Sequence, residues 1–537
     1  MIHPVLLGIL IAIPVLLAPW PGIQWGDGLE LVAASSHLGV AHAPGYPLFT
    51  LIGWLFLKSA PMEPYNALVL MSRLCIIVAS VLAGRLVQRA CSAGERPASP
   101  VIAVVVAVLL PFSGVFAQWL QNVEVYAFGI LLMVGAALAL DPFRKDPLPL
   151  GRIILGASLI GCAVANHLPS LALGPLLLVQ AFRSAGPTPR AFLAMLPAAL
   201  LPILLYGTMP LRRTEYGIYW GGVEAWPSLY AHIRGGEYAQ YRFLMLLPGT
   251  PFTLATWLPF AGERLLLLTA SWGALFFGDG PTALIAGVLT VPVLVLGLRS
   301  AIQKSALRLP ICALILAPFM QTGFVLLYNI PDISDYFPGI NIFLLPFIII
   351  GILEGAHRFL VRAYTRALLL RSLGGIALLA TISVRTPLLF SDSNQFAGFW
   401  QARLLEALPK DAAIITIGDA DIFTLWYTQF ALRERTDLAV VGANFLRFGW
   451  AVNTIPPNDP ARRLVKFRDA PPPDSLKSYL TMVSDLAIDP LLTRGRVFTT
   501  DSGDDSMLWL QQRYRLRRVA KLLTPEEIDL ILNRGDI

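Results

Sequence analysis

Long apolar runs separated by short polar connections dominate the first two thirds of the chain, and they recur from the N-terminus to about residue 384. Runs of this kind can cross a hydrocarbon core about 30 Å thick. The pattern therefore predicts a polytopic α-helical membrane domain over residues 1–388, with about eleven transmembrane helices. These helices are expected at residues 3–20, 68–88, 100–118, 125–141, 151–165, 168–183, 191–209, 282–298, 309–328, 339–356 and 367–384.

Two stretches fit this pattern less well. The pair of runs at 151–183 is short for two crossings, and Asn166 and His167 stand at the bend between them. The apolar stretch 264–278 is too short to be distinguished from a helix that lies at the membrane interface.

Beyond residue 388, short apolar runs alternate with polar segments, which is typical of a soluble α/β domain. Two strands flank a helix there, and this order predicts one βαβ unit. The sequence thus predicts a C-terminal α/β domain over residues 389–537. Its expected elements are strands at 412–418, 438–445 and 496–501, a helix opened by Asp419 or Asp421, and a last helix with Thr524 and Glu527 as its capping box.

Composition supports a membrane protein and excludes several other classes. Of the 537 residues, 56% are hydrophobic and 14% are charged, whereas soluble domains carry about 25% charged residues. Residues 391–537 hold 18 Lys and Arg against 19 Asp and Glu, so the basic excess lies in the membrane part. No basic patch is interleaved with aromatic residues, which argues against nucleic acid as a partner. The four cysteines lie in or beside apolar runs and indicate neither a disulfide framework nor a thiolate metal site.

The Lys and Arg residues of the short connections predict the orientation. They fall on alternate connections, and cytoplasmic loops collect such residues. The N-terminal run lacks a basic segment and a cleavage site, so we expect a retained first helix with a cytoplasmic N-terminus. The opposite face, outside a bacterial inner membrane or its equivalent, then holds a first outer loop at 21–66, a large outer loop at 210–281 and the C-terminal domain. The basic residues used are Arg85, Arg89, Arg96, Arg144, Lys145, Arg183, Arg190, Arg299, Lys304, Arg308, Arg358, Arg362 and Arg366.

The first outer loop carries most of the candidate chemistry. Asp27 and Glu30 have the spacing of residues on one helix face. One of these carboxylates could act as a general base for an acceptor hydroxyl. The pair could also bind a divalent metal, although oxygen ligands alone do not identify which one. Alternatively, Asp27 caps the helix and Glu30 is solvated. The turn from His42 to Pro47 is either a re-entrant structural turn or a site at which His42 contacts a phosphate or sugar.

Other outer connections add candidates, each with a structural alternative. Glu124, at a membrane exit, is either functional or paired with an arginine. His167 is either a site residue or a hydrogen-bonded packing element. Arg212 and Arg213 are either interfacial anchors or ligands of a lipid-linked phosphate, because guanidinium groups match phosphate oxygens. Asp332, Asp335 and Tyr336 lie at a further exit, where capping of the next helix explains them nearly as well.

Several of these motifs carry a family resemblance. The run Trp25-Gly-Asp27-Gly-Leu-Glu30 and the following LGVAHAPGYPLF resemble the opening signature of the membrane family catalogued as protein of unknown function 2723. This family includes transmembrane protein 260-like protein O-mannosyltransferases of the GT-C type. The resemblance extends over roughly residues 5–450. Ala43 and Ala420 depart from the commoner family pattern. Further family-like stretches are 123–128, 166–171, 206–212 with the YWGG at 219–222, 329–338 and 408–446.

The resemblance implies a GT-C glycosyltransferase fold whose members use polyprenyl-phosphate sugars as donors. By motif position, Asp27 is the catalytic candidate, with Glu30 beside it. Mannose or another hexose would pass with inversion to an acceptor hydroxyl, on protein Ser or Thr or on a glycan, and no cofactor is required because the leaving group is already a phosphate. The alternatives are a transporter or flippase of lipid-linked sugar and a non-catalytic receptor or assembly factor. The substrate-binding candidates are His42, Tyr46, Glu124, Tyr126, His167, Arg212 and Arg213.

Overall fold

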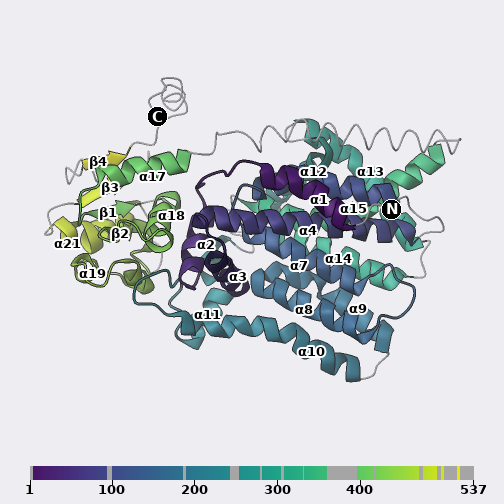
Figure 1. Ribbon diagram of the computed structural model, residues 1–537, viewed down its shortest axis with the longest axis horizontal. Helices are drawn as coiled ribbons and strands as arrows, with labels where there is room; N and C mark the ends of the chain where they lie inside the picture. The colour runs from purple at the N-terminus through teal and green to yellow at the C-terminus, as the bar shows by residue number, and fades with distance from the viewer. Residues whose placement is uncertain are drawn as a thin grey trace.

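A helical body carries a small sheet domain at one end in the computed structural model of the chain (Figure 1). The predicted crossing at 367–384 and the predicted capping box at Thr524 and Glu527 lie outside the residues that the structure describes. The described residues are 4–93, 100–185, 189–241, 253–277, 281–303, 307–330, 332–359, 396–416, 418–470, 476–492, 497–500 and 517–520.

The body is built from apolar helices. Among the described residues, five helical segments are long and apolar enough to span a membrane, namely 64–92, 192–212, 281–303, 308–325 and 333–358. The chain is therefore an integral membrane protein. The longer helices are α1 (Pro4–Leu17), α4 (Pro64–Ser92), α5 (Pro100–Leu109), α7 (Val125–Leu140), α8 (Leu150–Asn166), α9 (Gly174–Ala185), α10 (Pro189–Ile203), α12 (Leu254–Phe277), α13 (Pro281–Gln303), α14 (Arg308–Val325) and α15 (Phe337–Phe359).

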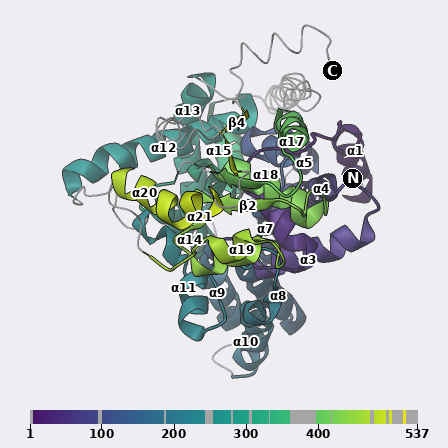
Figure 2. The ribbon, with the colours of Figure 1, turned by 90° about the vertical axis from the view of Figure 1, so that its left-hand side faces the viewer.

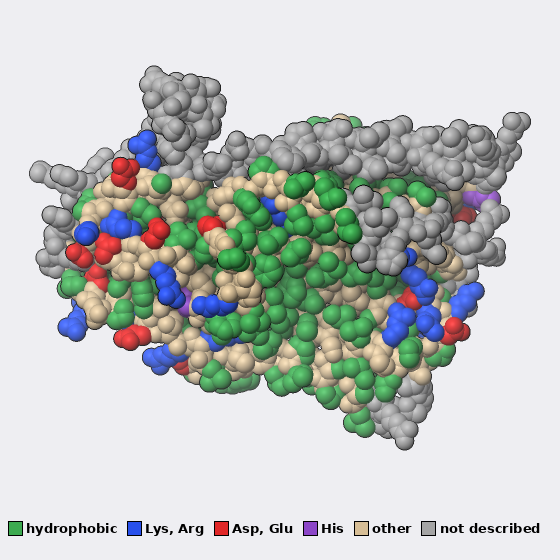
Figure 3. Space-filling view, viewed as in Figure 1, with side chains coloured by type: hydrophobic (Ala, Val, Ile, Leu, Met, Phe, Trp, Pro, Cys, Tyr) green, Lys and Arg blue, Asp and Glu red, His purple; other side chains and the backbone are tan. Residues whose placement is uncertain are grey.

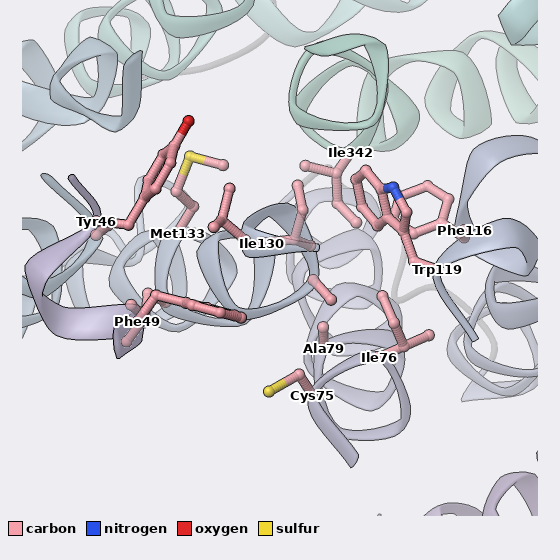
Figure 4. Close-up of a cluster of buried hydrophobic side chains, with 14 of the residues drawn as sticks. Tyr46, Phe49, Cys75, Ile76, Ala79, Phe116, Trp119, Ile130, Met133 and Ile342 are labelled. Atoms are coloured by element: carbon pink, nitrogen blue, oxygen red, sulfur yellow. The ribbon is translucent and has the colours of Figure 1, made fainter. Parts of the chain in front are cut away.

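The surface of the body matches this composition. Figure 3 shows apolar side chains covering the middle of the molecule, while charged side chains gather at the sheet-domain end and at the opposite end. Inside, helices from distant parts of the sequence share one core. Figure 4 shows part of it, in which Tyr46 and Phe49 lie at one end and Phe116 and Trp119 at the other.

Shorter helices and 3-10 turns connect the long helices of the body. The predicted helix at 168–183 begins instead as a 3-10 turn, because Pro169 disfavours helical backbone in the residue before it. The predicted helix at 100–118 is broken before Gly114, whose φ is 46°. The shorter elements are α2 (Asp27–Ser36), α3 (Pro47–Ser59), η1 (Leu110–Phe112), α6 (Gly114–Trp119), η2 (Leu168–Leu173), η3 (Leu204–Arg212), α11 (Trp226–Ile233), η4 (Gly236–Tyr241) and η5 (Ile333–Tyr336).

The apolar stretch expected at 264–278 belongs to a longer helix, α12. Trp257 Nε1 donates to the Leu326 carbonyl at 3.0 Å, and Asn341 Nδ2 donates to Ser271 Oγ at 3.0 Å. Ser113 Oγ donates to the Leu275 carbonyl at 2.8 Å. Along its length, α12 therefore contacts the end of α14, the start of α15 and the break after α5.

The C-terminal domain contains a four-stranded parallel sheet in the order β2-β1-β3-β4. The predicted βαβ unit and the predicted third strand are confirmed, and β4 is an additional strand. Figure 2 faces the sheet-domain end of the molecule, and there the sheet domain lies in front of the helical body. Its elements are β1 (Ala413–Thr416), β2 (Ala439–Gly442), β3 (Val497–Thr500), β4 (Arg517–Ala520), α17 (Phe396–Ala407), α18 (Asp419–Trp426), α19 (Ala461–Leu464), α20 (Leu476–Val483), α21 (Asp489–Leu492), the π-helical turns Tyr427–Ala431 and Ser484–Ile488, and the 3-10 turns Ala443–Phe445 and Gly449–Thr454.

Candidate active site

A cluster of three side chains, Asp27 and Glu30 of α2 and His42 of the turn that follows, forms the centre of the site. Glu30 receives two hydrogen bonds from His42: the backbone N–H donates to Oε1 at 3.1 Å, and Nδ1 donates to Oε2 at 2.9 Å. The other ring nitrogen, Nε2, lies 3.5 Å from Asp27 Oδ2 and 3.2 Å from the Tyr46 hydroxyl. His42 thus links the two carboxylates.

Local backbone geometry brings these residues together. Gly26 has a φ of 128°, and α2 begins immediately after it with Asp27 as its first residue. Gly26 occupies the N-cap position without a side-chain capping bond, so Asp27 is not the N-cap residue. At the other end of the loop, Gly45 has a φ of 93°, and a β-carbon there would lie 2.5 Å from the Met209 side chain. Pro47 then starts α3 with the φ that proline favours.

The two carboxylates differ in exposure. The Asp27 side chain is 47% exposed, whereas that of Glu30 is fully buried. Both Glu30 oxygens are occupied by His42, so Glu30 orients His42 and does not reach the open side of the site. Asp27 is the carboxylate of the pair that a substrate can contact.

Charge around His42 favours its protonated form. Burial alone lowers the pKa of His42, but the nearby carboxylates Asp27 and Glu30 outweigh this effect and raise its pKa to about 9. Burial raises the pKa of Glu30, opposed by the charge and hydrogen bonds of His42. The cluster therefore presents an imidazolium at neutral pH, held between a buried carboxylate and a half-exposed one.

An aromatic wall borders the cluster. The His167 ring lies 6.0 Å from the Tyr46 ring, 5.2 Å from Tyr126 and 5.4 Å from Tyr336, between ring centroids. Burial and the charge of His42 lower the pKa of His167 to about 3, so this imidazole is neutral. The start of α7, the end of α8 and η5 thus contribute to one surface.

Glu124 lies at the N-cap position of α7 without a side-chain capping bond. Burial raises its pKa well above the usual value, and the charges of Asp335, Asp27 and Asp332 raise it further. Among the ion pairs of the described residues, none joins Glu124 to an arginine. Glu124 therefore belongs electrostatically to the same group of carboxylates as Asp27.

The two candidate arginines have different surroundings. Arg212 donates from Nη1 to Thr50 Oγ1 at 2.6 Å and from Nη2 to the Pro47 carbonyl at 3.1 Å, next to Tyr46. Arg213 points elsewhere: its side chain is 69% exposed, and its Nε lies 3.6 Å from Glu224 Oε1. The structure brings Arg212 to the start of α3 and leaves Arg213 at the surface.

A third arginine, which sequence reasoning did not select, contacts residues that precede η5 along the chain. Arg264 of α12 is 8% exposed, and its Nη2 donates to Asn329 Oδ1 at 3.2 Å and to the Ile330 carbonyl at 3.4 Å. In the described part of the chain, its buried Nε has no hydrogen-bond partner. A buried guanidinium with a free donor is suited to an anionic group.

The sheet domain contacts the end of α2 and the segment after η3. Ser36 Oγ donates to the Phe430 carbonyl at 2.9 Å, and the Gly217 N–H donates to the Asn453 carbonyl at 2.9 Å. The Trp220 ring stacks on Trp450 with centroids 5.1 Å apart and lies 5.9 Å from the His42 ring. Trp220 thus connects the cluster of Asp27, Glu30 and His42 to the core of the sheet domain.

Two further residues face the cluster without having been selected from the sequence. Tyr238 of η4 has its ring 6.4 Å from His42. Asp419, at the start of α18, interacts electrostatically with both Asp27 and His42. The family-like Gly-Asp-Ala-Asp motif marked Asp419 only as a possible helix start, and no pattern marked Tyr238. Among the described residues, no group of three or more His, Cys, Asp or Glu side chains could hold a metal ion.

Two family models match parts of this chain. Residues 27–187 match the family described as the protein O-mannosyl-transferase TMEM260 N-terminal domain, and residues 400–458 match TMEM260-associated domain 2. The first match begins at Asp27 and includes Glu30, His42, Glu124 and His167. The second includes α18 and β2.

Curated relatives match over shorter stretches. The protein O-mannosyl-transferase tmem260 of Dictyostelium discoideum is 45% identical over 42 residues, which cover 8% of this chain and 5% of the relative. Protein O-mannosyl-transferase TMEM260 of Mus musculus is 35% identical over 115 residues, which cover 21% of this chain and 16% of the relative. The chain thus matches less than a fifth of the length of either relative.

Similarity to solved structures is broad but low. An archaeal oligosaccharyltransferase, AglB from Archaeoglobus fulgidus, solved with an inhibitory peptide and a dolichol-phosphate, has a TM-score of 0.41 at 11% identity, covering 79% of this chain and 63% of that one. The apo form of the Archaeoglobus fulgidus oligosaccharyltransferase has a TM-score of 0.42 at 11% identity, covering 83% and 66%. Residues 27–187 and 400–458 of this chain are therefore similar to two domains of the TMEM260 protein O-mannosyl-transferase family.

Proposed function

We propose that this chain is a membrane glycosyltransferase of GT-C type. It transfers mannose or another hexose from a polyprenyl-phosphate donor to a hydroxyl of a protein acceptor, with inversion at the anomeric carbon. One observation carries the proposal: the half-exposed Asp27 carboxylate lies against a buried His42–Glu30 pair, where the membrane body meets the sheet domain. The match of residues 27–187 to a protein O-mannosyl-transferase domain supports this chemistry.

Asp27 acts as the general base in this proposal. It removes the proton of the acceptor hydroxyl as that oxygen attacks the anomeric carbon. The bond from the anomeric carbon to the phosphate oxygen breaks on the opposite side, and the polyprenyl phosphate leaves with the electron pair. Because this leaving group is already an anion of low basicity, the step requires no acid to protonate it.

His42 and Glu30 position Asp27. Since both Glu30 oxygens are bonded to His42, the ring is fixed with Nε2 toward Asp27 and the Tyr46 hydroxyl. Tyr46, Tyr126, His167 and Tyr336 form the wall beside the sugar, where aromatic rings pack against the apolar face of a hexose. Glu124 lies two residues before Tyr126 along the chain. When it is protonated, its carboxyl group can donate one hydrogen bond to a sugar hydroxyl and accept another through its carbonyl oxygen.

The donor phosphate is bound by arginine side chains. Arg212, next to Tyr46, and the buried Arg264, beside Asn329, can each donate charge-assisted hydrogen bonds to phosphate oxygens. The exposed Arg213 contributes to the charge of the same face. Leu265, Leu266 and Leu267 follow Arg264 and are exposed on the surface of the body, where a lipid chain would lie.

The orientation of the chain follows from its basic connections. The charged connections predicted to be cytoplasmic place the N-terminus inside, and the Asp27 cluster and the sheet domain outside. The acceptor then approaches from the outer side, which is covered by the sheet domain, while the donor reaches the site from the membrane.

A donor-consumption assay tests the proposal. Purified full-length protein is incubated with polyprenyl-phosphate hexose labelled in the sugar, with and without Ser- or Thr-containing peptides. We expect release of polyprenyl phosphate and labelled peptide. Movement of the intact donor across vesicle membranes without cleavage would instead identify a transporter. If the protein neither cleaves nor moves the donor, it is a receptor or an assembly factor.

A further inference from the structure

The carboxyl ends of β1 and β3 form a topological switch point in the C-terminal sheet. From β1 the chain continues to β2 on one side, whereas β3 pairs with β1 on the other side. In parallel sheets, ligands bind outside the carboxyl ends of the strands at such a point, because the connections leave in opposite directions and open a crevice.

Polar side chains end both strands on one face of the sheet. The register pairs Ile414 with Phe498, so that Thr416 and Thr500 follow on the same face. Ile414 belongs to the same core as Ile422 of α18, which identifies this face as the one covered by α18. Thr416 is fully buried, and in the described part of the chain its hydroxyl has no hydrogen-bond partner. A buried unpaired hydroxyl at this position points to a ligand that would satisfy it.

Two carboxylates at the start of α18 adjoin these threonines. Asp421 is 7% exposed, and its side chain interacts with Thr500. Burial raises the pKa of Asp421 to about 6. No described lysine or arginine forms an ion pair with Asp419 or Asp421. Carboxylates without cationic partners accept hydrogen bonds from N–H and O–H groups and attract cations.

Asp419 lies between the carboxyl end of the sheet and the cluster of Asp27, Glu30 and His42. It is exposed at the start of α18, and α18 packs against α2, whose first residue is Asp27. Asp419 is near enough for its charge to interact with Asp27 and with His42. The carboxyl end of the sheet therefore lies next to Asp27 and His42.

We propose that Thr416, Asp419, Asp421 and Thr500 form the subsite for the acceptor polypeptide. This subsite binds N–H and O–H donors of the segment next to the acceptor hydroxyl and favours basic over acidic flanking residues. The proposal rests on the proposed function, in which the base must lie on the acceptor side of the sugar, opposite the leaving phosphate. Asp419 adjoins that base from the sheet domain, whereas the lipid-linked phosphate comes from the membrane body.

Kinetics with charged peptides test the subsite. Two peptides of equal length, each with one Thr, carry Lys or Glu on both sides of it. For the full-length wild type we expect the Lys-flanked peptide to have a KM at least about tenfold lower. In D419N and D421N this difference falls to about threefold or less, while the KM for the lipid-linked donor stays within about twofold. T416V, which keeps the side-chain shape, raises the KM for both peptides.

A matched variant and a binding measurement separate the possible failures. D485N changes an exposed aspartate of the same domain and is expected to keep the wild-type peptide preference. Fluorescence anisotropy of the labelled peptides without donor measures binding even if no transfer occurs, so failure of the proposed function does not hide the subsite. Equal binding of both peptides by the wild type, or an unchanged preference in both D419N and D421N, would overturn the proposal.

Discussion

At the scale of single residues, Asp27 and Glu30 have separate tasks that their spacing alone did not reveal. The i, i+3 spacing predicted a pair of carboxylates on one helix face, and both do reach His42. Only the structure shows that Glu30 is completely buried and bonded through both oxygens. Its partner is twelve residues away along the chain, beyond the end of α2, so no local pattern could identify it.

The charge state of His42 makes a prediction about pH. Its pKa is raised to about 9 in the folded protein, against about 6.5 in the unfolded chain. The stabilisation is therefore fully present below pH 6.5 and is lost as the pH rises through 9. We expect the melting temperature and the transfer rate of the wild type to fall together between pH 7 and pH 10.

The variant E30Q tests the origin of this pH dependence. Loss of the buried carboxylate lowers the pKa of His42 and leaves a buried charge less well compensated, at a cost of roughly 3 kcal/mol. The melting temperature should fall, and the alkaline loss of activity should begin at lower pH than in the wild type. An E30Q protein with the wild-type pH profile would show that Glu30 does not control His42.

Arg264 gives a second prediction at this scale. Replacing it by Gln removes the charge but keeps a polar side chain, so the KM for the lipid-linked donor should rise about 10- to 100-fold, as expected for a lost charged hydrogen bond. R234Q, which changes an exposed arginine directly after α11, serves as the control. A donor KM that responds equally in both variants would remove Arg264 from the phosphate site.

At the scale of elements, the apolar pattern identified the helices and the βαβ unit, but not where helices break. Pro169 and Gly114 interrupt two predicted helices because of backbone restrictions at and next to these residues. The extension of α12 back to Leu254 was missed, since Pro259, Glu263 and Arg264 weaken the apolar pattern there. The strands were predictable because all three expected ones are short apolar runs bounded by turn residues.

Trp220 packs between the sheet domain and His42 and holds the two together. Its side chain is 5% exposed and stacks on Trp450. W220A should lower the free energy of unfolding by about 3–5 kcal/mol through the cavity it leaves. Hydrogen exchange should accelerate in the backbone of 36–42 and 443–454, whereas W226A, which changes a tryptophan that is 73% exposed, should leave both segments protected. Equal protection in W220A and wild type would contradict this role.

At the scale of the whole molecule, the sequence predicted that polar groups from separate exits converge on one face. His42, Tyr46, Tyr126, His167 and Tyr336 do meet, and Arg212 lies next to them. The contribution of the sheet domain could not be predicted, because the pairs Ser36–Phe430 and Gly217–Asn453 join residues more than two hundred positions apart. Such contacts follow from the packing of the two parts and leave no periodic signal.

The measurement that tests the account most directly compares D27N with the wild type in a single-turnover transfer assay, alongside donor binding. Because Asn keeps the shape of the side chain but cannot take the acceptor proton, the transfer rate should fall by about 10²- to 10⁴-fold. Donor affinity should stay within about threefold, and D485N should react like the wild type. A D27N protein that transfers sugar at the wild-type rate would contradict the assignment of Asp27 as the base.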